Sequence, residues 1–259
     1  MYRNIIVGYD GSDEAEDALA LAEVLRDQRG VITRAREDEP GTLHRVVHDS
    51  HADLLVLGSS RRARAGRTHT GPVGRRLLFG SPCTVAVAPK GFRHAAARPR
   101  RVAIAFEAED EALHAVEEGV RLAQSFGADV RLMCLVPPVA PWTLVAGTDA
   151  GYARSDVERH HRATFAHVLD RALVAVPDEV QAEGNMVEGR PDAALAAASR
   201  AEADLLVLAS PGVRPVPGVR PGATATAIMR ACTCPVLLTP TGARDTEAPA
   251  RPRGPVGTT

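Results

Sequence analysis

The apolar hexamer Ala52-Asp53-Leu54-Leu55-Val56-Leu57 occurs a second time in this 259-residue chain as Ala203-Asp204-Leu205-Leu206-Val207-Leu208, 151 positions later. The same offset relates Gly71 to Gly222 and Cys83 to Cys234. One short apolar run can recur by chance, but a register that holds from residue 40 to residue 89 does not. The sequence therefore predicts a tandem duplication.

The offset between the copies is smaller near their starts. Residues 4–10 match residues 101–107 at an offset of 97, and Gly30 matches Gly127 in the same way. The second copy therefore holds 54 residues (151 − 97) that the first lacks, opposite residues 128–181. Because this block contains one apolar run and one helical pattern, we expect that the first copy has lost a strand and a helix as a unit, including its second strand. A βαβ architecture tolerates such a loss best.

Continuous apolar runs alternate with amphipathic segments through both copies. Runs rich in Val, Ile and Leu predict parallel strands that are buried on both faces. In the first copy we expect strands at 4–8, 31–36, 53–58 and 83–88, and helices from Ser12 to Gly30, at 41–51 and at 72–79. The second copy should add a strand at 129–136 and a helix at 156–176. The expected fold class is α/β, with two tandem doubly wound, Rossmann-like parallel-sheet domains of four and five strands.

The repeat also sets the expected domain boundaries. Residues 1–92 form the shortened domain, 93–100 a linker and 101–240 the full domain. The tail at 241–259 is rich in Pro, Gly and Arg, which predicts disorder.

Composition excludes several classes of protein. A formal net charge of −1 gives no reason to expect nucleic acid or a membrane as a partner. Four cysteines do not make a disulfide framework, and their spacing does not complete a zinc site, so we expect buried thiols and no metal. The chain reaches its first strand by Asn4 without a signal peptide, and no apolar run approaches bilayer length. A cytoplasmic location follows as the expectation.

Two loops of each copy should meet beyond the carboxyl ends of the strands, where doubly wound sheets bind ligands. In the first copy these loops are Tyr9-Asp10-Gly11-Ser12 and the segment from Gly58 to Gly71. The chain resembles a tandem universal stress protein in these loops and in three stretches: 5–12, 52–60 and 81–85. The resemblance implies the adenine nucleotide alpha hydrolase-like form of the Rossmann-like fold. It also implies that members pair through their last strands.

ATP-binding members of this family carry G-x2-G-x9-G-[ST] in the second loop, an aspartate after the first strand, and part of the adenine wall on the second strand. The first copy keeps the aspartate and two glycines, but Arg61 replaces the second glycine and Pro72 replaces the Ser/Thr. The second copy has Ala209 and Ala223 at motif positions and a glutamate after its first strand. The resemblance thus implies these candidate nucleotide contacts: Asp10, Gly58, Arg61, Gly71 and Val73 in the first copy, and Glu107, Gly212, Gly222 and Thr224 in the second.

The second loop of the first copy is unusually basic. Arg61, Arg62, Arg64 and Arg67 bring four guanidinium groups to it, and guanidinium forks suit phosphate oxygens. A solvated, mobile basic loop is the alternative interpretation.

Neither a metal-binding acid nor a general base can be placed, so we expect no enzyme and no certain cofactor. The favoured hypothesis is a non-catalytic stress-response protein that acts as a dimer-like interaction module, with degenerate nucleotide sites and an unknown protein partner. Its two copies would pair within the chain through their last strands, and a homodimer is the alternative. The competing hypothesis is a stress sensor that retains one weak ATP or AMP site, either in the second copy or across both copies.

Overall fold

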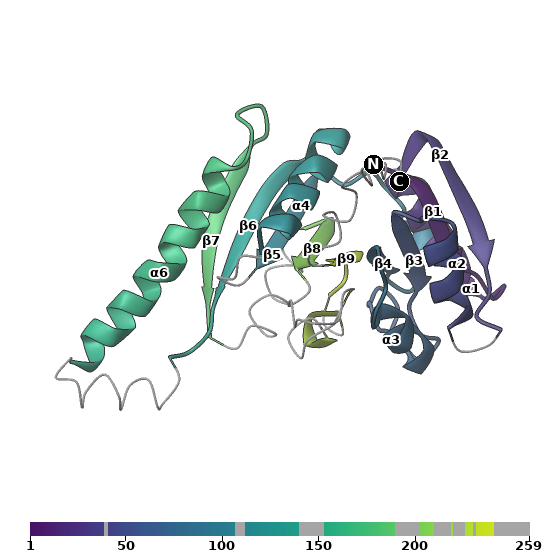
Figure 1. Cartoon of the computed structure of the whole chain (residues 1–259), viewed down its shortest axis with the longest axis horizontal. Helices are drawn as coiled ribbons and strands as arrows, with labels where there is room; N and C mark the ends of the chain where they lie inside the picture. Colours follow the sequence, from purple (N-terminus) through teal and green to yellow (C-terminus); the bar gives the residue numbers. More distant parts are fainter. Residues whose placement is uncertain are drawn as a thin grey trace, which may run out of the picture.

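The computed structural model describes residues 1–38, 41–106, 112–139, 153–189, 203–209, 219, 226–229 and 232–240 (Figure 1). The first half of the chain forms β1 (Tyr2–Gly8), α1 (Asp13–Leu25), β2 (Arg26–Ala35), α2 (Thr42–Asp49), β3 (Leu54–Gly58), α3 (Pro72–Leu78), β4 (Thr84–Ala88) and the 3-10 helix η1 (Phe92–His94). The second half forms β5 (Arg101–Phe106), α4 (Ala112–Phe126), β6 (Asp129–Val136), α6 (Arg154–Val174), β7 (Ala182–Glu188), β8 (Leu205–Ala209) and β9 (Val236–Thr239). The predicted tail lies outside the described residues, as do all four candidate contacts of the second copy.

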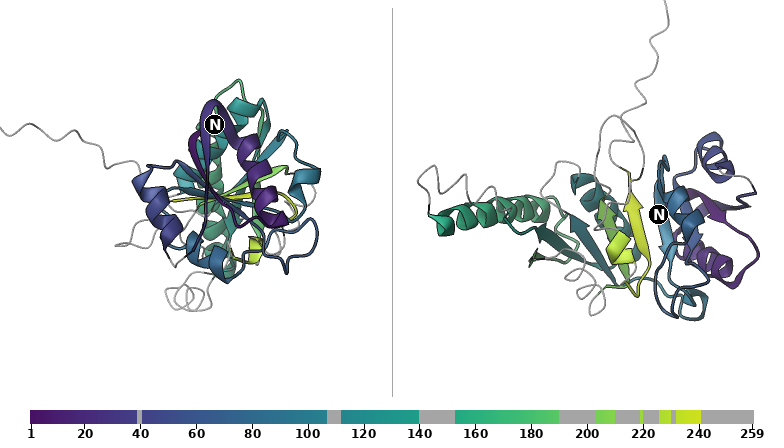
Figure 2. Two further views of the ribbon diagram at one scale, coloured as in Figure 1. Left: turned by 90° about the vertical axis from the view of Figure 1, so that its right-hand side faces the viewer. Right: turned by 90° about the horizontal axis from the view of Figure 1, so that it is seen from below.

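Within the described parts of the chain, the strands form a single sheet of nine in the order β2-β1-β3-β4-β9-β8-β5-β6-β7. The strands of each half are parallel to one another, and among these nine strands the central pair, β4 and β9, is the one antiparallel pair. The predicted α/β class is confirmed, with four strands in the first half and five in the second. The right-hand view of Figure 2 shows the two halves meeting at this central pair.

Helices cover both faces of the sheet because the strands are apolar on both sides. One apolar core packs α1, α4 and α6 against one face, through residues such as Leu21, Leu122 and Leu169. A second core packs α2 and α3 against the other face, through residues such as Leu43 and Leu78. The inner strands β3 and β4 carry almost wholly buried side chains, as their continuous apolar sequences predict.

Helix α1 is shorter than predicted. The Ser12 hydroxyl caps its start by accepting a hydrogen bond from the backbone N–H of Ala15 at 3.3 Å. The helix ends at Leu25, and Gly30 lies inside β2 instead of ending the helix. A Cβ atom at Gly30 would lie 2.8 Å from the carbonyl oxygen of Tyr2, so glycine is needed here for close approach of two strands. Its counterpart Gly127 has a φ of 66° just after α4, the left-handed conformation that ends a helix.

The first half also keeps a strand beside its first strand. β2 pairs with β1 in parallel, as β6 pairs with β5. The expectation that the first copy lacks this strand is therefore wrong. The sheet position without an equivalent is that of β7, at the outer edge, together with α6, the helix that packs on β6 and β7. An edge strand can be lost without leaving a gap in the sheet, whereas an inner strand cannot.

The junction of the two halves is apolar across the sheet and polar at one side. Val85 lies opposite Leu238, and Val87 lies opposite Val236, and all four side chains are fully buried. Beside this pair of strands, the Tyr2 hydroxyl donates a hydrogen bond to the buried carboxylate of Glu118 on α4. Arg121 pairs with the same carboxylate at 2.7 Å. The buried charge is thus compensated, which is the condition for a stable ion pair between two packed elements.

Candidate functional site

A cavity of about 290 Å³ opens in the first half where β1 and β3 end. These neighbouring strands continue in opposite directions across the sheet, β1 toward β2 and β3 toward β4, so the cavity lies at the switch point of the strand order. All five candidate residues of the first copy line it: Asp10, Gly58, Arg61, Gly71 and Val73. The structure thus brings together residues that are as many as 63 positions apart in the sequence. Whether they bind a ligand stays a prediction.

Asp10 is oriented by two neighbours. Its Oδ1 accepts hydrogen bonds from the backbone N–H of Ser12 at 3.0 Å and from the Ser12 hydroxyl at 2.5 Å. Its Oδ2 lies 3.5 Å from the guanidinium Nη2 of Arg61, across the mouth of the cavity. The hydrogen bonds from Ser12, and secondarily the Arg61 charge, lower the pKa of the Asp10 carboxyl below its usual range. Asp10 is therefore a fixed carboxylate acceptor that faces the cavity.

Gly58 is required by packing as well as by its place in the loop. A Cβ atom at Gly58 would lie 2.0 Å from the carbonyl oxygen of Glu14, in the first turn of α1. A Cβ atom at Gly71 would meet only the Ser60 side chain, with its hydroxyl at 3.3 Å. The two motif glycines therefore differ, because only Gly58 is held by a backbone contact that cannot move aside.

The basic loop is closed at its base and tied to the segment after β4. The backbone N–H of Ser60 donates to the His69 carbonyl at 2.6 Å, and that of Gly66 donates to the Lys90 carbonyl at 2.8 Å. Lys90, the only lysine of the chain, contacts two residues that line the cavity. Its Nζ donates to the Arg61 carbonyl at 2.7 Å and lies 3.1 Å from a carboxylate oxygen of Glu14. These bonds hold the backbone of Arg61, although its guanidinium remains three-quarters exposed.

Pro72 occupies the first position of α3, and Gly71 precedes it as the N-cap with no side-chain hydrogen bond. Proline fits this position but has no N–H group, and it also lacks the hydroxyl that the family motif provides. The helix has only seven residues, so its dipole is a weak anchor for anions.

Sequence reasoning missed two carboxylates that line the cavity. Glu14 lies in the first turn of the predicted helix that begins at Ser12, and neither Glu14 nor Glu37 belongs to a recognisable motif. The two oxygens of Glu37 accept hydrogen bonds from the backbone N–H groups of Gly41 and Leu43, each at 2.7 Å. Glu14 is buried and paired with Lys90. Its placement four residues after Asp10, on the turn that faces β3, was the signal that could have identified it.

Tyr9 lines the cavity on the side of the sheet edge. The backbone N–H of Tyr9 donates to the Ala35 carbonyl at the end of β2, at 2.8 Å. The Arg34 guanidinium lies 4.7 Å from the centre of the Tyr9 ring, and the Tyr9 hydroxyl donates to Glu16. β2 thus holds Tyr9 in the cavity wall, and Glu37, two residues beyond β2, also lines the cavity.

The family model described as the universal stress protein family matches residues 99–240, which is more than half of the chain. The chain belongs to the universal stress protein family. It is 27% identical over 210 residues to a universal stress protein of Mycobacterium tuberculosis strain H37Rv, and the match covers 80% of this chain and 70% of that protein.

Solved structures show the same universal stress protein fold over nearly the whole chain. A universal stress protein from Archaeoglobus fulgidus DSM 4304 superposes with a TM-score of 0.55 at 14% identity, over 94% of this chain and 97% of its own. A functionally unknown protein from Pseudomonas aeruginosa PAO1 superposes with a TM-score of 0.54 at 17% identity, over 91% and 81%. Among the described residues of this universal stress protein, no helix is long and apolar enough to cross a membrane.

Proposed function

We propose that this chain is a non-catalytic universal stress protein in which two tandem units form a permanent, dimer-like regulatory module. The antiparallel pairing of β4 with β9 carries this proposal. Family members pair through their last strands, and here the last strands of the two halves pair within one chain. Each half keeps its own parallel order around the first strand, with β2-β1-β3-β4 on one side and β7-β6-β5-β8-β9 on the other.

A permanent pair has a specific consequence for regulation. Two separate subunits dissociate on dilution. Two units joined in one chain associate intramolecularly, so their pairing does not depend on the protein concentration. Such a module presents the outer faces of both halves to a protein partner in a fixed relationship. A homodimer of the whole chain would have to use other surfaces, because β4 and β9 are both enclosed.

The test is reassembly of the two halves. Residues 1–97 and 98–259, expressed together as separate chains, are expected to form a one-to-one complex through the β4–β9 pair. Analytical ultracentrifugation measures the stoichiometry, and the intact chain should sediment as a compact monomer over the same concentrations. Two fragments that fold independently and do not associate would overturn the proposal. ATP hydrolysis by the intact chain, measured with Mg²⁺ present, should equal the buffer blank.

A second function is favoured by the cavity of the first half. Its volume, its position at the switch point and the oriented Asp10 carboxylate support a stress sensor that retains one weak ATP or AMP site. Thermal unfolding with millimolar ATP, ADP and AMP tests it. A ligand present at 100 times its Kd adds about 2.7 kcal/mol to the free energy of unfolding, which raises the midpoint measurably. An unchanged midpoint with every nucleotide would leave only the regulatory module.

A further inference from the structure

A long stretch of this chain carries only positive charge. From Leu54 to Phe106 the sequence holds ten arginines and one lysine but no aspartate or glutamate. Several of these cations pair with acids elsewhere, as Arg93 does with Asp13 and Asp17 on α1. Four exposed arginines have no ion pair with any residue that the structure describes: Arg62, Arg64, Arg75 and Arg76.

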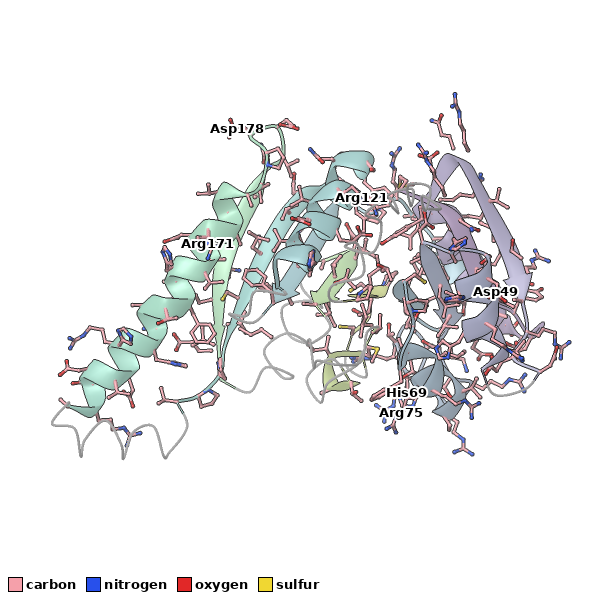
Figure 3. The ribbon with its side chains drawn as sticks, in the orientation of Figure 1. Asp49, His69, Arg75, Arg121, Arg171 and Asp178 are labelled. Atoms are coloured by element: carbon pink, nitrogen blue, oxygen red, sulfur yellow. The ribbon has the colours of Figure 1, made fainter. Side chains whose placement is uncertain are left out.

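These four arginines belong to the basic loop and to α3, which both border the first-half cavity, and within these two segments Arg61 is the arginine that lines it. The hydrogen bond between Ser60 and His69 brings the start of the basic loop beside the first turn of α3, so Arg61 and Pro72 line the same opening. Arg75 and Arg76 follow Pro72 by three and four positions on α3, which places them one turn beyond the mouth. Figure 3 shows Arg75 and His69 at the same end of the first half, beside α3.

The inner wall of the cavity carries carboxylates in place of cations. Its carboxylates are already compensated, Glu14 by Lys90 and Glu37 by two backbone N–H groups. Asp10 uses one oxygen for Ser12 and the other for Arg61. The cavity therefore offers carboxylate acceptors for hydroxyl groups on the inside and uncompensated cations on the outside. A ligand that fits both is a molecule with a hydroxyl-bearing neutral body and an anionic tail.

We propose that the arginine rim, formed by Arg61, Arg62, Arg64, Arg75 and Arg76, binds the phosphate groups of a nucleotide directly, without Mg²⁺. This inference rests on the second proposed function, the nucleotide site of the first half. Arginine forks replace the backbone N–H and the hydroxyl that are absent at Pro72. Each guanidinium carries five N–H donors in a planar fork, and the Asp10 pair occupies only one nitrogen of Arg61.

Two physical consequences distinguish this arrangement from a metal-dependent site. Five cations neutralise a triphosphate by themselves, and Mg²⁺ bound to the same oxygens would compete with them. Exposed charges are also strongly screened by salt. Affinity should therefore rise with the number of phosphates, fall steeply with ionic strength, and be equal or lower when Mg²⁺ is added.

The test is calorimetric titration of the full chain with adenosine, AMP, ADP, ATP and inorganic tripolyphosphate, each in EDTA and again in Mg²⁺. Tripolyphosphate has no nucleoside, so its binding reports on the arginine rim alone. Adenosine has no phosphate, so its binding reports on the inner wall of the cavity alone. We expect ATP in EDTA to bind at least about tenfold more tightly than adenosine, because adenosine has no phosphate with which to make charge-assisted hydrogen bonds to the guanidinium groups.

A double substitution tests whether the arginine rim is the source of the higher affinity for ATP. R75Q with R76Q should weaken ATP binding about fivefold or more and leave adenosine binding unchanged. The matched control is R29Q with R171Q, which removes the same charge from exposed arginines on β2 and α6. Apo melting midpoints of both double variants should equal that of the wild type, since all four side chains are exposed.

The outcomes separate the inference from the function on which it rests. Adenosine that binds as tightly as ATP, or ATP that requires Mg²⁺, would overturn the arginine rim and leave the nucleotide site. No binding of any nucleoside or nucleotide would overturn both. A single-stranded oligonucleotide that binds as tightly as ATP, and is not displaced by adenosine or AMP, would show a nucleic-acid surface in place of a nucleotide site.

Discussion

Thr68 and Val219 occupy equivalent places in the two halves, 151 positions apart, and make the same hydrogen bond across the junction. The backbone N–H of Thr68 donates to the Cys232 carbonyl at 3.1 Å, and that of Val219 donates to the Ser81 carbonyl at 2.9 Å. Ser81 and Cys232 are themselves 151 positions apart. The two halves therefore meet in a symmetric way, as two copies of one subunit do in a homodimer.

Thr68 makes a further bond that its counterpart cannot make. Its hydroxyl donates to the Cys234 carbonyl at 3.1 Å in a fully buried position. Thr68→Val keeps the shape but leaves a buried carbonyl unpaired, which should lower the free energy of unfolding by about 1–3 kcal/mol. Urea denaturation measures this change in the free energy of unfolding. Thr164→Val is the control, because that hydroxyl bonds to His160 on the exposed face of α6 and its loss should be nearly neutral.

The β4–β9 pair should be the part of the junction most sensitive to charge. Val85→Asp with Val236→Asp puts two carboxylates into a fully buried apolar seam, where no cation is available to pair with them among the described neighbours. We expect the halves to separate, with a larger hydrodynamic radius by size-exclusion chromatography and a strongly lowered melting midpoint. Val31→Asp with Val174→Asp adds the same charge at exposed sites and should change neither quantity. An unchanged radius and midpoint in the seam variant would contradict this.

The two motif glycines of the first half should respond differently to alanine. Gly58→Ala forces a Cβ against the backbone of α1 and should cost about 1–3 kcal/mol or more. Gly71→Ala meets only the Ser60 side chain, which can rotate, and should cost less than about 1 kcal/mol. Thermal and urea unfolding of both variants, without ligand, measure the difference. Equal stability of the two variants would show that Gly58 is not a packing residue.

The cysteines should behave as buried, unreactive thiols. All four are free and buried, and burial raises the pKa of Cys83 and of Cys134 to about 11. A thiol whose pKa is raised on folding contributes stability below its unfolded pKa of about 8.5, and this contribution is lost as the pH rises toward the folded value. The free energy of unfolding should therefore fall between about pH 8.5 and pH 11.

Thiol titration checks the same point directly. At pH 8 the native protein should react slowly with Ellman's reagent, because the thiolate is the reacting species and little of it forms in a buried site. In denaturant all four cysteines should react at once. A thiol that reacts rapidly in the native state would contradict the buried assignment.

Most element positions follow from local sequence. The predicted strand at 129–136 matches β6 (Asp129–Val136), and the expected helix at 72–79 matches α3 within one residue. The error at Gly30 has a local cause as well. A glycine ends a helix or lets two strands approach each other closely, and the sequence does not distinguish the two uses.

The sequence by itself determined which segments are strands, that each half is parallel, and where the candidate loops lie, because burial on both faces requires continuous apolar runs. Only the tertiary structure decided that one sheet spans both halves, that β2 lies beside β1, and that Lys90 joins Glu14 to the Arg61 backbone. An apolar strand is equally compatible with several neighbours, so its partner depends on packing between distant segments. The charges around the cavity follow the same rule, since their pairing depends on distances that the sequence does not contain.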